Sequence, residues 1–172
     1  LQEIDSRIEL RLDSFLETPH LVNRANANEI TMGLLDVMDA DALRRYFWEK
    51  VQIYDSVTSI YFGNADGGLV LGGREGADGS LYVIVTDNFE SGPFNKYTTD
   101  EHGNPDELIG TFPDFDARER PWYIEAVEHE GASWSEPYVL FTRQGMALAS
   151  SLPVYDDDGN DPFFHVFSPV LS

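Results

Sequence analysis

The spacing of the apolar residues changes once along this chain, and this change constrains the fold more than any other feature of the sequence. In residues 1–52 the apolar side chains recur at intervals of three and four residues, which is the period of a helix with one buried face. In residues 53–172 they occur in short runs rich in β-branched and aromatic residues, separated by turn-forming residues. We therefore expect a helical stalk and a second helix in residues 1–52, and a sheet module in residues 53–172, as in an α+β domain.

The stalk is predicted from an apolar stripe in the first 16 residues, with charged residues on the rest of the helix surface. The members of this stripe are Ile4, Ile8, Leu12, Phe15 and Leu16. Pro19 is expected to bend or interrupt the helix, because proline removes a backbone hydrogen bond, and the helical pattern resumes over Leu21–Ile30. Such a stripe either pairs with a second copy of the chain, as a homodimer, or packs on its own domain, and the residues leave both readings open.

The second helix is marked by its cap and by its buried face. Asp39 and Asp41 are candidate N-caps, because a short carboxylate accepts hydrogen bonds from the first free backbone N–H groups of a helix. Leu43, Phe47 and Val51 follow at intervals of four residues, so they are expected on the buried side.

Short strands are expected in the second part of the chain. They are Val57–Phe62, Leu69–Leu71, Leu81–Thr86, Tyr138–Thr142, Met146–Tyr155 and Phe163–Phe167, with 143–145 as the connection between Tyr138–Thr142 and Met146–Tyr155. Turn residues connect the first three, which therefore predict an antiparallel meander. The expected fold is one five-stranded antiparallel sheet with helices on one of its faces.

Two connections carry a prediction of their own. Asp87–Pro113 has no clear period and is rich in Gly, Pro, Asn, Asp and Thr. A loop of this length is usually functional or carries short elements of its own, and we expect it to form part of a pocket wall. Asp156–Asn160 is predicted to be a tight turn. It is a poor calcium loop, because an alignment on Gly159 places Val154 and His165 at the two positions where acidic ligands are required.

The stretch Phe115–Tyr138 concentrates arginine and large aromatic residues. Pro121 suits the first position of a helix, where its missing N–H would be unpaired in any case. The helix is predicted to run to about Glu130, with Gly131 as its C-terminal stop.

Arg118 and Arg120 lie just before this helix, where backbone N–H groups favour anions and a guanidinium fits a carboxylate. One interpretation is a small anionic or zwitterionic ligand held by arginine and covered by aromatic rings. The other is that Trp122, Tyr123 and Trp134 are core residues and that the arginines pair with surface acids. The residues alone leave both open.

The composition excludes some partners and some chemistry. The net charge of −20 repels phosphate backbones, so we expect no nucleic-acid binding, and we expect salt to stabilise the domain by screening self-repulsion. The absence of cysteine excludes disulfides and thiolate metal sites. No nucleophile elbow, phosphate-binding glycine loop or His-Glu-x-x-His pattern occurs, so no catalytic residue, metal site or cofactor is predicted.

Four segments resemble the double Cache (dCache) extracellular sensor domain. They are FDARERPWY at Phe115–Tyr123, WSEPY at Trp134–Tyr138, ASSLPVYD at Ala149–Asp156 with Gly159 after it, and IYFGN at Ile60–Asn64. The resemblance implies a PAS-like five-stranded module behind a long N-terminal helix. It also implies the periplasmic or extracellular part of a transmembrane signalling receptor, such as a chemoreceptor, histidine kinase or nucleotide cyclase.

The same resemblance implies a place for this chain in a longer protein. The chain looks like the long helix and the membrane-distal module, and it ends about where a membrane-proximal module would begin. We expect membrane anchors in flanking segments, a small-molecule ligand, no cofactor and no catalysis by this domain.

The amino-acid-binding branch of that family holds the ligand carboxylate with Arg, Trp and Tyr. Position by position, this implies a carboxylate contact for Arg120, Trp122 and Tyr123, and an amine contact for Tyr138. Together with Arg118 and Phe115, these residues form the predicted ligand site.

Three positions depart from that branch. Phe115 replaces a tyrosine, Leu140 stands where an aspartate can occur, and Ser168 stands where the last strand normally supplies the amine-binding aspartate. A desolvated ammonium without a counter-charge is costly, which argues against an α-amino acid. A carboxylate, or a neutral ligand with aromatic cover, fits better. The rival function is a structural or dimerisation module with a degenerate pocket, in which Arg118 and Arg120 form salt bridges.

Overall fold

The computed structural model describes residues 2–142, 145–155 and 165–171 of the chain. In chain order the helices are α1 (Gln2–Thr31), α2 (Ala40–Ile53), the 3-10 turns η1 (Asp87–Phe89) and η2 (Ala117–Glu119), and α3 (Pro121–His129). The strands are β1 (Ser59–Gly63), β2 (Leu69–Glu75), β3 (Ser80–Thr86), β4 (Gly92–Thr99), β5 (Pro105–Phe115), β6 (Ser133–Trp134), β7 (Tyr138–Val139), β8 (Met146–Val154) and β9 (His165–Leu171). The predicted turn Asp156–Asn160 and the first residues of the predicted strand Phe163–Phe167 lie outside the described residues.

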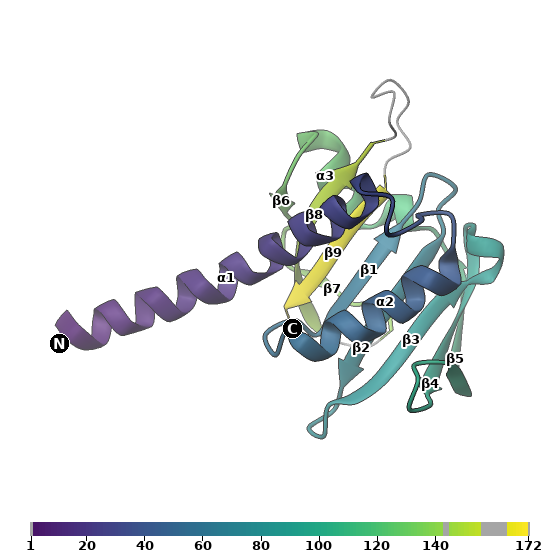
Figure 1. Cartoon of the computed structure of the whole chain (residues 1–172), viewed down its shortest axis with the longest axis horizontal. Coiled ribbons are helices and arrows are strands. Elements are labelled where there is room, and N and C mark those ends of the chain that lie inside the picture. Colours follow the sequence, from purple (N-terminus) through teal and green to yellow (C-terminus); the bar gives the residue numbers. More distant parts are fainter. Residues whose placement is uncertain (1, 143–144, 156–164, 172) are drawn as a thin grey trace.

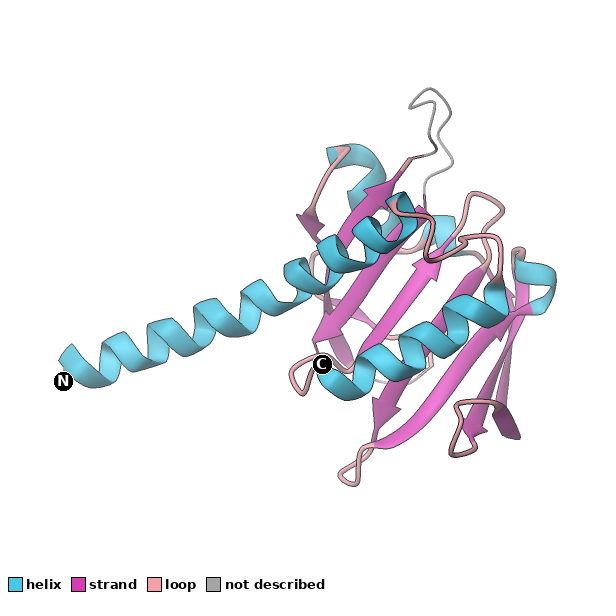
Figure 2. Ribbon diagram, in the orientation of Figure 1, coloured by secondary structure: helices cyan, strands magenta, loops and turns pink. Residues whose placement is uncertain are grey.

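The strands form one antiparallel sheet, so the α+β class is confirmed (Figures 1 and 2). The strand order is β5-β4-β3-β2-β1-β9-β8-β6, and β7 pairs with β8. Five of the predicted strands correspond to β1, β2, β3, β8 and β9, which lie next to one another as the centre of the sheet. The predicted strand Tyr138–Thr142 is shorter in the structure, where β7 covers only Tyr138–Val139. In this register the last strand returns beside the first, which places Ser168 opposite Tyr61.

The prediction of a long loop over Asp87–Pro113 is wrong. This segment contains η1, β4 and β5, which extend the sheet on the β3 side. The strand pattern is hidden because β5 is an edge strand with mostly exposed side chains, and its pairing with β4 shifts register at irregular positions. An edge strand with a proline at its start and no buried face lacks the alternation by which strands are recognised.

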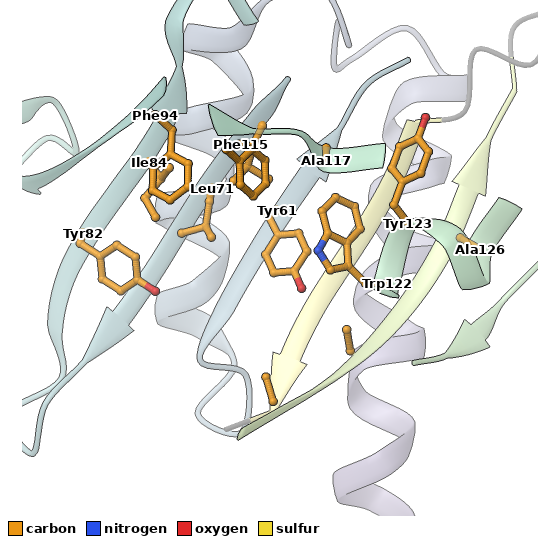
Figure 3. Packing of buried hydrophobic residues seen from close by; sticks show 13 residues of the cluster. Tyr61, Leu71, Tyr82, Ile84, Phe94, Phe115, Ala117, Trp122, Tyr123 and Ala126 are labelled. Atoms are coloured by element: carbon orange, nitrogen blue, oxygen red, sulfur yellow. The ribbon is translucent and has the colours of Figure 1, made fainter. Parts of the chain in front are cut away.

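Helices cover both faces of the sheet, whereas the sequence suggested one. On one face α1 and α2 bury Val22, Leu43 and Phe47 against Ile60 and Phe62 of β1. On the other face α3 packs Trp122 and Ala126 against a second cluster, which includes Tyr61 (Figure 3). Because successive side chains of a strand point to opposite faces, β1 contributes to both cores.

The first helix is continuous through Pro19, so the predicted interruption does not occur. A proline inside a helix costs roughly 3 kcal/mol, and the burial of the residues that follow it offsets this cost. Val22, Asn23 and Asn26 are buried, and the Asn23 side-chain amide donates to the Ser150 carbonyl at 3.0 Å. The part of α1 before Pro19 projects away from the sheet, and Leu12 remains 54% exposed (Figure 1).

The second helix forms as predicted. Asp39 is its N-cap and accepts a hydrogen bond from the Ala42 N–H at 2.9 Å. Leu43, Phe47 and Val51 are fully buried. No helix in the described part of the chain combines the length and the apolar character needed to cross a bilayer.

The third helix starts at Pro121 as predicted but ends one residue early. It ends at His129, and Glu130 is the residue in the left-handed conformation, with φ of 51°. Gly131, the predicted stop, follows that residue. The chain therefore uses a glutamate in a conformation that costs an L-residue free energy.

Candidate functional site

A cavity of about 50 Å³ lies between the sheet and the segment that runs from β7 to Thr142. This volume exceeds what one water molecule requires. The residues around it are Ser59, Tyr61, Leu69, Leu71, Tyr82, Ile84, Phe94, Phe115, Arg120, Trp122, Tyr138, Leu140, Phe141 and Thr142.

The floor of the cavity follows from the alternation of side chains along the central strands. Tyr61 on β1, Leu69 and Leu71 on β2, and Tyr82 and Ile84 on β3 occupy alternate positions and face the α3 side of the sheet (Figure 3). The floor is therefore apolar except for the hydroxyl groups of Ser59, Tyr61 and Tyr82.

Arg120 supplies the charge of the cavity wall. It is the N-cap residue of α3 and has an extended backbone conformation, so its side chain leaves the helix start toward the cavity. Its Nη2 donates to the Val139 carbonyl oxygen at 3.4 Å, and its guanidinium carbon lies 5.3 Å from the centre of the Phe141 ring. Among the described residues Arg120 forms no ion pair, and no other charged side chain lines the cavity.

Trp122 forms the wall next to Arg120. Its side chain is 3% exposed and its ring lies 4.8 Å from that of Tyr61 in an edge-on arrangement (Figure 3). This contact depends on Gly63, where a Cβ atom would lie 2.6 Å from the indole.

Tyr138 contributes a hydroxyl group at the opposite wall. Its oxygen lies 2.5 Å from that of Tyr61, so the two phenols share a hydrogen bond. Burial raises the pKa of Tyr138 to about 12, an effect that the bond to Tyr61 and the charge of Arg120 partly oppose. Burial is the larger effect, so this hydroxyl stays neutral at ordinary pH.

Phe115 belongs to an aromatic group that closes the cavity on the β4–β5 side. Its ring lies 5.0 Å from that of Phe94 and 5.3 Å from that of Phe141, both edge-on. Aromatic pairs prefer this arrangement, and it surrounds the cavity with hydrocarbon.

The structure brings four of the six predicted residues to the cavity, namely Phe115, Arg120, Trp122 and Tyr138, while Arg118 and Tyr123 do not line it. Arg118 binds Asp116, with Nη2 at 2.6 Å from Oδ2, and also donates to the Ala65 carbonyl at 3.2 Å. The hydrogen bond to Arg118 lowers the pKa of the Asp116 carboxyl against the opposing effect of burial. This pair holds the turn that leads into α3.

Tyr123 lies on the far side of Trp122 from Tyr61 (Figure 3). Its ring is 5.7 Å from that of Trp122, and its side chain is 5% exposed. Burial raises its pKa to about 12. Arg118 and Tyr123 therefore support the residues that face the cavity.

Sequence reasoning missed the residues that come from distant strands, chiefly Tyr61, Tyr82, Phe94 and Phe141. The alternation along β1 and β3 was the available signal for the first two, because it selects one face of each strand. The Lys96 ammonium lies 4.1 Å from the centre of the Tyr82 ring and 2.6 Å from a Glu75 carboxylate oxygen.

The lining of the cavity suits the binding of a small molecule. The parts of the chain that the structure describes contain no cluster of His, Asp or Glu that could hold a metal ion. The wall offers one guanidinium, several hydroxyls and a large apolar surface, which together fit a small ligand with one anionic end.

No family model matches the chain, and no curated protein matches it. Solved structures do match. The ligand-binding domain of Mlp24 with asparagine superposes with a TM-score of 0.61 at 18% identity, covering 100% of this chain and 55% of that one. The ligand-binding domain of the Pseudomonas aeruginosa PAO1 amino acid chemoreceptor PctC with GABA superposes with a TM-score of 0.56 at 20% identity, covering 99% of this chain and 58% of that one.

A third match is the extracellular domain assigned to the histidine kinase soHK1S-Z6, with a TM-score of 0.59 at 16% identity, covering 94% of this chain and 55% of that one. The chain thus spans about half the length of the solved structures that it matches. The first two of these structures are ligand-binding domains, and the third is an extracellular domain. The chain has the fold of the Cache-type, PAS-like ligand-binding domains of chemoreceptors and histidine kinases.

Proposed function

We propose that this chain is the ligand-sensing domain of a transmembrane signalling receptor of the chemoreceptor, histidine kinase or nucleotide cyclase type, and that it binds a small carboxylate-bearing molecule. One observation carries the ligand part of the proposal. In a protein with a net charge of −20, the described wall of the cavity has no carboxylate and one guanidinium, that of Arg120. A site with that charge attracts an anionic group.

Each residue of the site has a distinct role in this proposal. Arg120 binds the ligand carboxylate, Trp122 and Phe115 shape the cavity, and Tyr138 offers a hydroxyl group. Arg118 and Tyr123, which lie behind these residues, hold the start of α3 in place. The domain carries out no catalysis and transmits the presence of its ligand to other parts of the receptor.

The proposal includes a location. The fold likeness to extracellular domains supports a place in the periplasm or outside the cell, with membrane anchors in flanking segments of the receptor. A carboxylate sensor at that place samples solutes before they enter the cell.

A structural or dimerisation module is the second candidate, and the exposed stripe on α1 favours it. Leu12, Phe15 and Leu16 are 54%, 43% and 40% exposed, which is unusual for three apolar residues of one helix face. We propose that this stripe pairs with a second copy. The double variant Leu12→Gln/Phe15→Gln should then lower the sedimentation coefficient of the dimer to that of a monomer, and an unchanged coefficient contradicts the pairing.

Thermal shifts test the sensor proposal. A ligand at 100 times its Kd adds about 2.7 kcal/mol of stability, and each kcal/mol moves the midpoint of a domain of this size by roughly 2–4 °C. A panel of organic acids, amino acids, amines and sugars should therefore contain a carboxylate that raises the midpoint clearly.

The variant Arg120→Ala should abolish that shift, because it removes the charge that holds the carboxylate. Arg45→Ala is the matched control, since Arg45 is exposed on α2, away from the cavity. A panel without any shift, or a shift that both variants retain, contradicts the proposed site.

A further inference from the structure

We propose that the ligand is a monocarboxylate with an uncharged, apolar body, and that the cavity selects against the α-ammonium group of an amino acid. This inference rests on the proposed function and names the class of ligand for the same cavity. Three features of the described residues carry it: the pairing of the nearby acids, the state of the hydroxyl groups and the distribution of apolar surface.

The carboxylates near the cavity already have cations of their own. Asp116 adjoins Phe115 in sequence, and its side chain accepts three hydrogen bonds from the Arg118 guanidinium, the shortest at 2.6 Å. Glu75 lies 2.6 Å from Lys96, whose ammonium sits over the Tyr82 ring. Neither acid is available to balance a ligand ammonium, and an uncompensated buried charge is costly.

The hydroxyl groups do not replace those acids. Tyr61 and Tyr138 bond to each other at 2.5 Å, so each already uses part of its hydrogen-bonding capacity. Burial keeps the Tyr138 phenol neutral, with a pKa of about 12. A neutral phenol offers an ammonium a dipole but no opposite charge, whereas it can donate to a carboxylate.

Arg120 can bind one carboxylate without breaking a strong contact. Its hydrogen bond to the Val139 carbonyl is long, at 3.4 Å, and a charge-assisted bond to a carboxylate is shorter and stronger. A second ligand carboxylate would find no second guanidinium on the described wall. The arginine therefore sets the number of ligand charges at one.

The rest of the cavity suits hydrocarbon. Leu69, Leu71 and Ile84 form its floor, and Phe94 and Phe115 close one side. Removal of a short alkyl chain from water onto such a surface is favourable.

Matched ligands test the proposal by isothermal titration calorimetry. 3-Methylbutanoate and valine share one carbon skeleton and differ by the α-ammonium group, and propanoate and alanine form a second such pair. 3-Methylbutanamide removes the charge from the acid end, and succinate adds a second carboxylate. We expect 3-methylbutanoate to bind at least about tenfold more tightly than valine, the amide or succinate.

A variant that supplies the missing acid sharpens the test. Leu140 lines the cavity, so Leu140→Asp should reverse the preference within the valine pair, while Leu140→Asn, of the same shape but uncharged, should not. Circular dichroism checks that both variants fold. If Leu140→Asp does not fold, the ligand pairs on the unaltered chain decide the question.

The outcomes separate this inference from the proposed function. Tighter binding of valine, alanine or succinate than of the monocarboxylates overturns the inference but leaves a ligand sensor. Equal binding of the amide and the acid overturns the role of Arg120. A folded protein that binds no member of the panel overturns both.

Discussion

Trp122 owes its position to a residue that has no side chain. A Cβ atom on Gly63 would lie 2.6 Å from the Trp122 indole and 3.0 Å from the Cβ of Ala117. Both distances are too short for ordinary van der Waals contact, and the indole is buried among fixed neighbours. The shape of the cavity beside Trp122 therefore depends on the glycine at position 63.

Gly63→Ala should displace the indole and destabilise the domain by about 1–3 kcal/mol, the usual cost of an added methyl group in a packed core. The affinity for the ligand should also fall in this variant, because the displaced Trp122 lines the cavity. Urea denaturation and titration measure the two effects. Gly131→Ala is the control, since the nearest atom to its Cβ would be 3.7 Å away. Equal effects of both variants would disprove the close contact at Gly63.

The buried phenol of Tyr138 predicts an alkaline limit to stability. Its pKa is about 12 in the folded protein and about 10 when exposed, so the folded state retains the proton longer. The stabilisation is therefore complete below pH 10 and is lost as the pH rises toward 12, by about 3 kcal/mol. Urea denaturation at pH 9 and at pH 11.5 measures the free energy of unfolding. It should fall more between these pH values in the unaltered protein than in Tyr138→Phe. Identical losses would mean that Tyr138 ionises as if exposed.

At the scale of elements, α3 ends on a strained residue. Glu130 adopts φ of 51°, a conformation that costs an L-residue roughly 1–2 kcal/mol and glycine very little. The C-terminal end of α3, opposite Arg120, therefore carries backbone strain that lowers the stability of the domain.

Glu130→Gly should stabilise the domain by about 1 kcal/mol, because glycine relieves that strain. Glu130→Gln removes the same charge but keeps a side chain, so it reports the electrostatic part of any gain. Thermal denaturation of the three proteins measures the difference. A gain in the glutamine variant as large as in the glycine variant would assign the effect to charge instead.

The sequence predicts the elements that have a clear local pattern. α2 was recognisable because Leu43 and Phe47 recur at helical spacing on a buried face, and β1 because it is a short run rich in β-branched and aromatic residues, all of which are buried. β5 was not, because its exposed side chains carry no alternation. The passage of α1 through Pro19 depends on tertiary contacts such as Asn23 to Ser150, which no local pattern contains.

The candidate site divides in the same way. Phe115, Arg120, Trp122 and Tyr138 come from one short stretch, so composition and spacing pointed to them together. Tyr82 and Phe141 reach the cavity through the order of strands in the sheet and through the segment after β7. That arrangement is a property of the folded chain, so the sequence alone did not select these residues.

At the scale of the whole molecule, the net negative charge opposes both folding and the approach of the proposed anionic ligand. The chain has 31 acidic residues against 11 lysines and arginines. Self-repulsion of this size destabilises the compact state. An anionic ligand must also approach a negative surface before it meets Arg120.

Sodium chloride should raise the thermal midpoint, because ions screen charges that lie more than about 10 Å apart at 0.1 M. The effect should shrink at pH 4, where many carboxylates are protonated and less repulsion remains. Differential scanning calorimetry at both pH values measures it. A midpoint that falls with salt at pH 7 would mean that attractive ion pairs dominate the surface.

The cavity and α1 lie on opposite faces of the sheet, and β1 contributes side chains to both, with Tyr61 toward the cavity and Ile60 and Phe62 toward the helices. The anchored part of α1 rests on β8 through Asn23 and through His20, whose Nδ1 lies 2.9 Å from the Ser150 hydroxyl. Its 30 residues make a rod about 45 Å long. The part of α1 beyond this seat, from Asn23 back to Gln2, is about 30 Å long at a rise of 1.5 Å per residue, so a tilt of about 5° at the seat would move the N-terminal end by about 3 Å. α1 therefore acts as a lever arm. A small change in side-chain packing where the helix contacts the sheet produces a larger displacement at the N-terminal end of the helix.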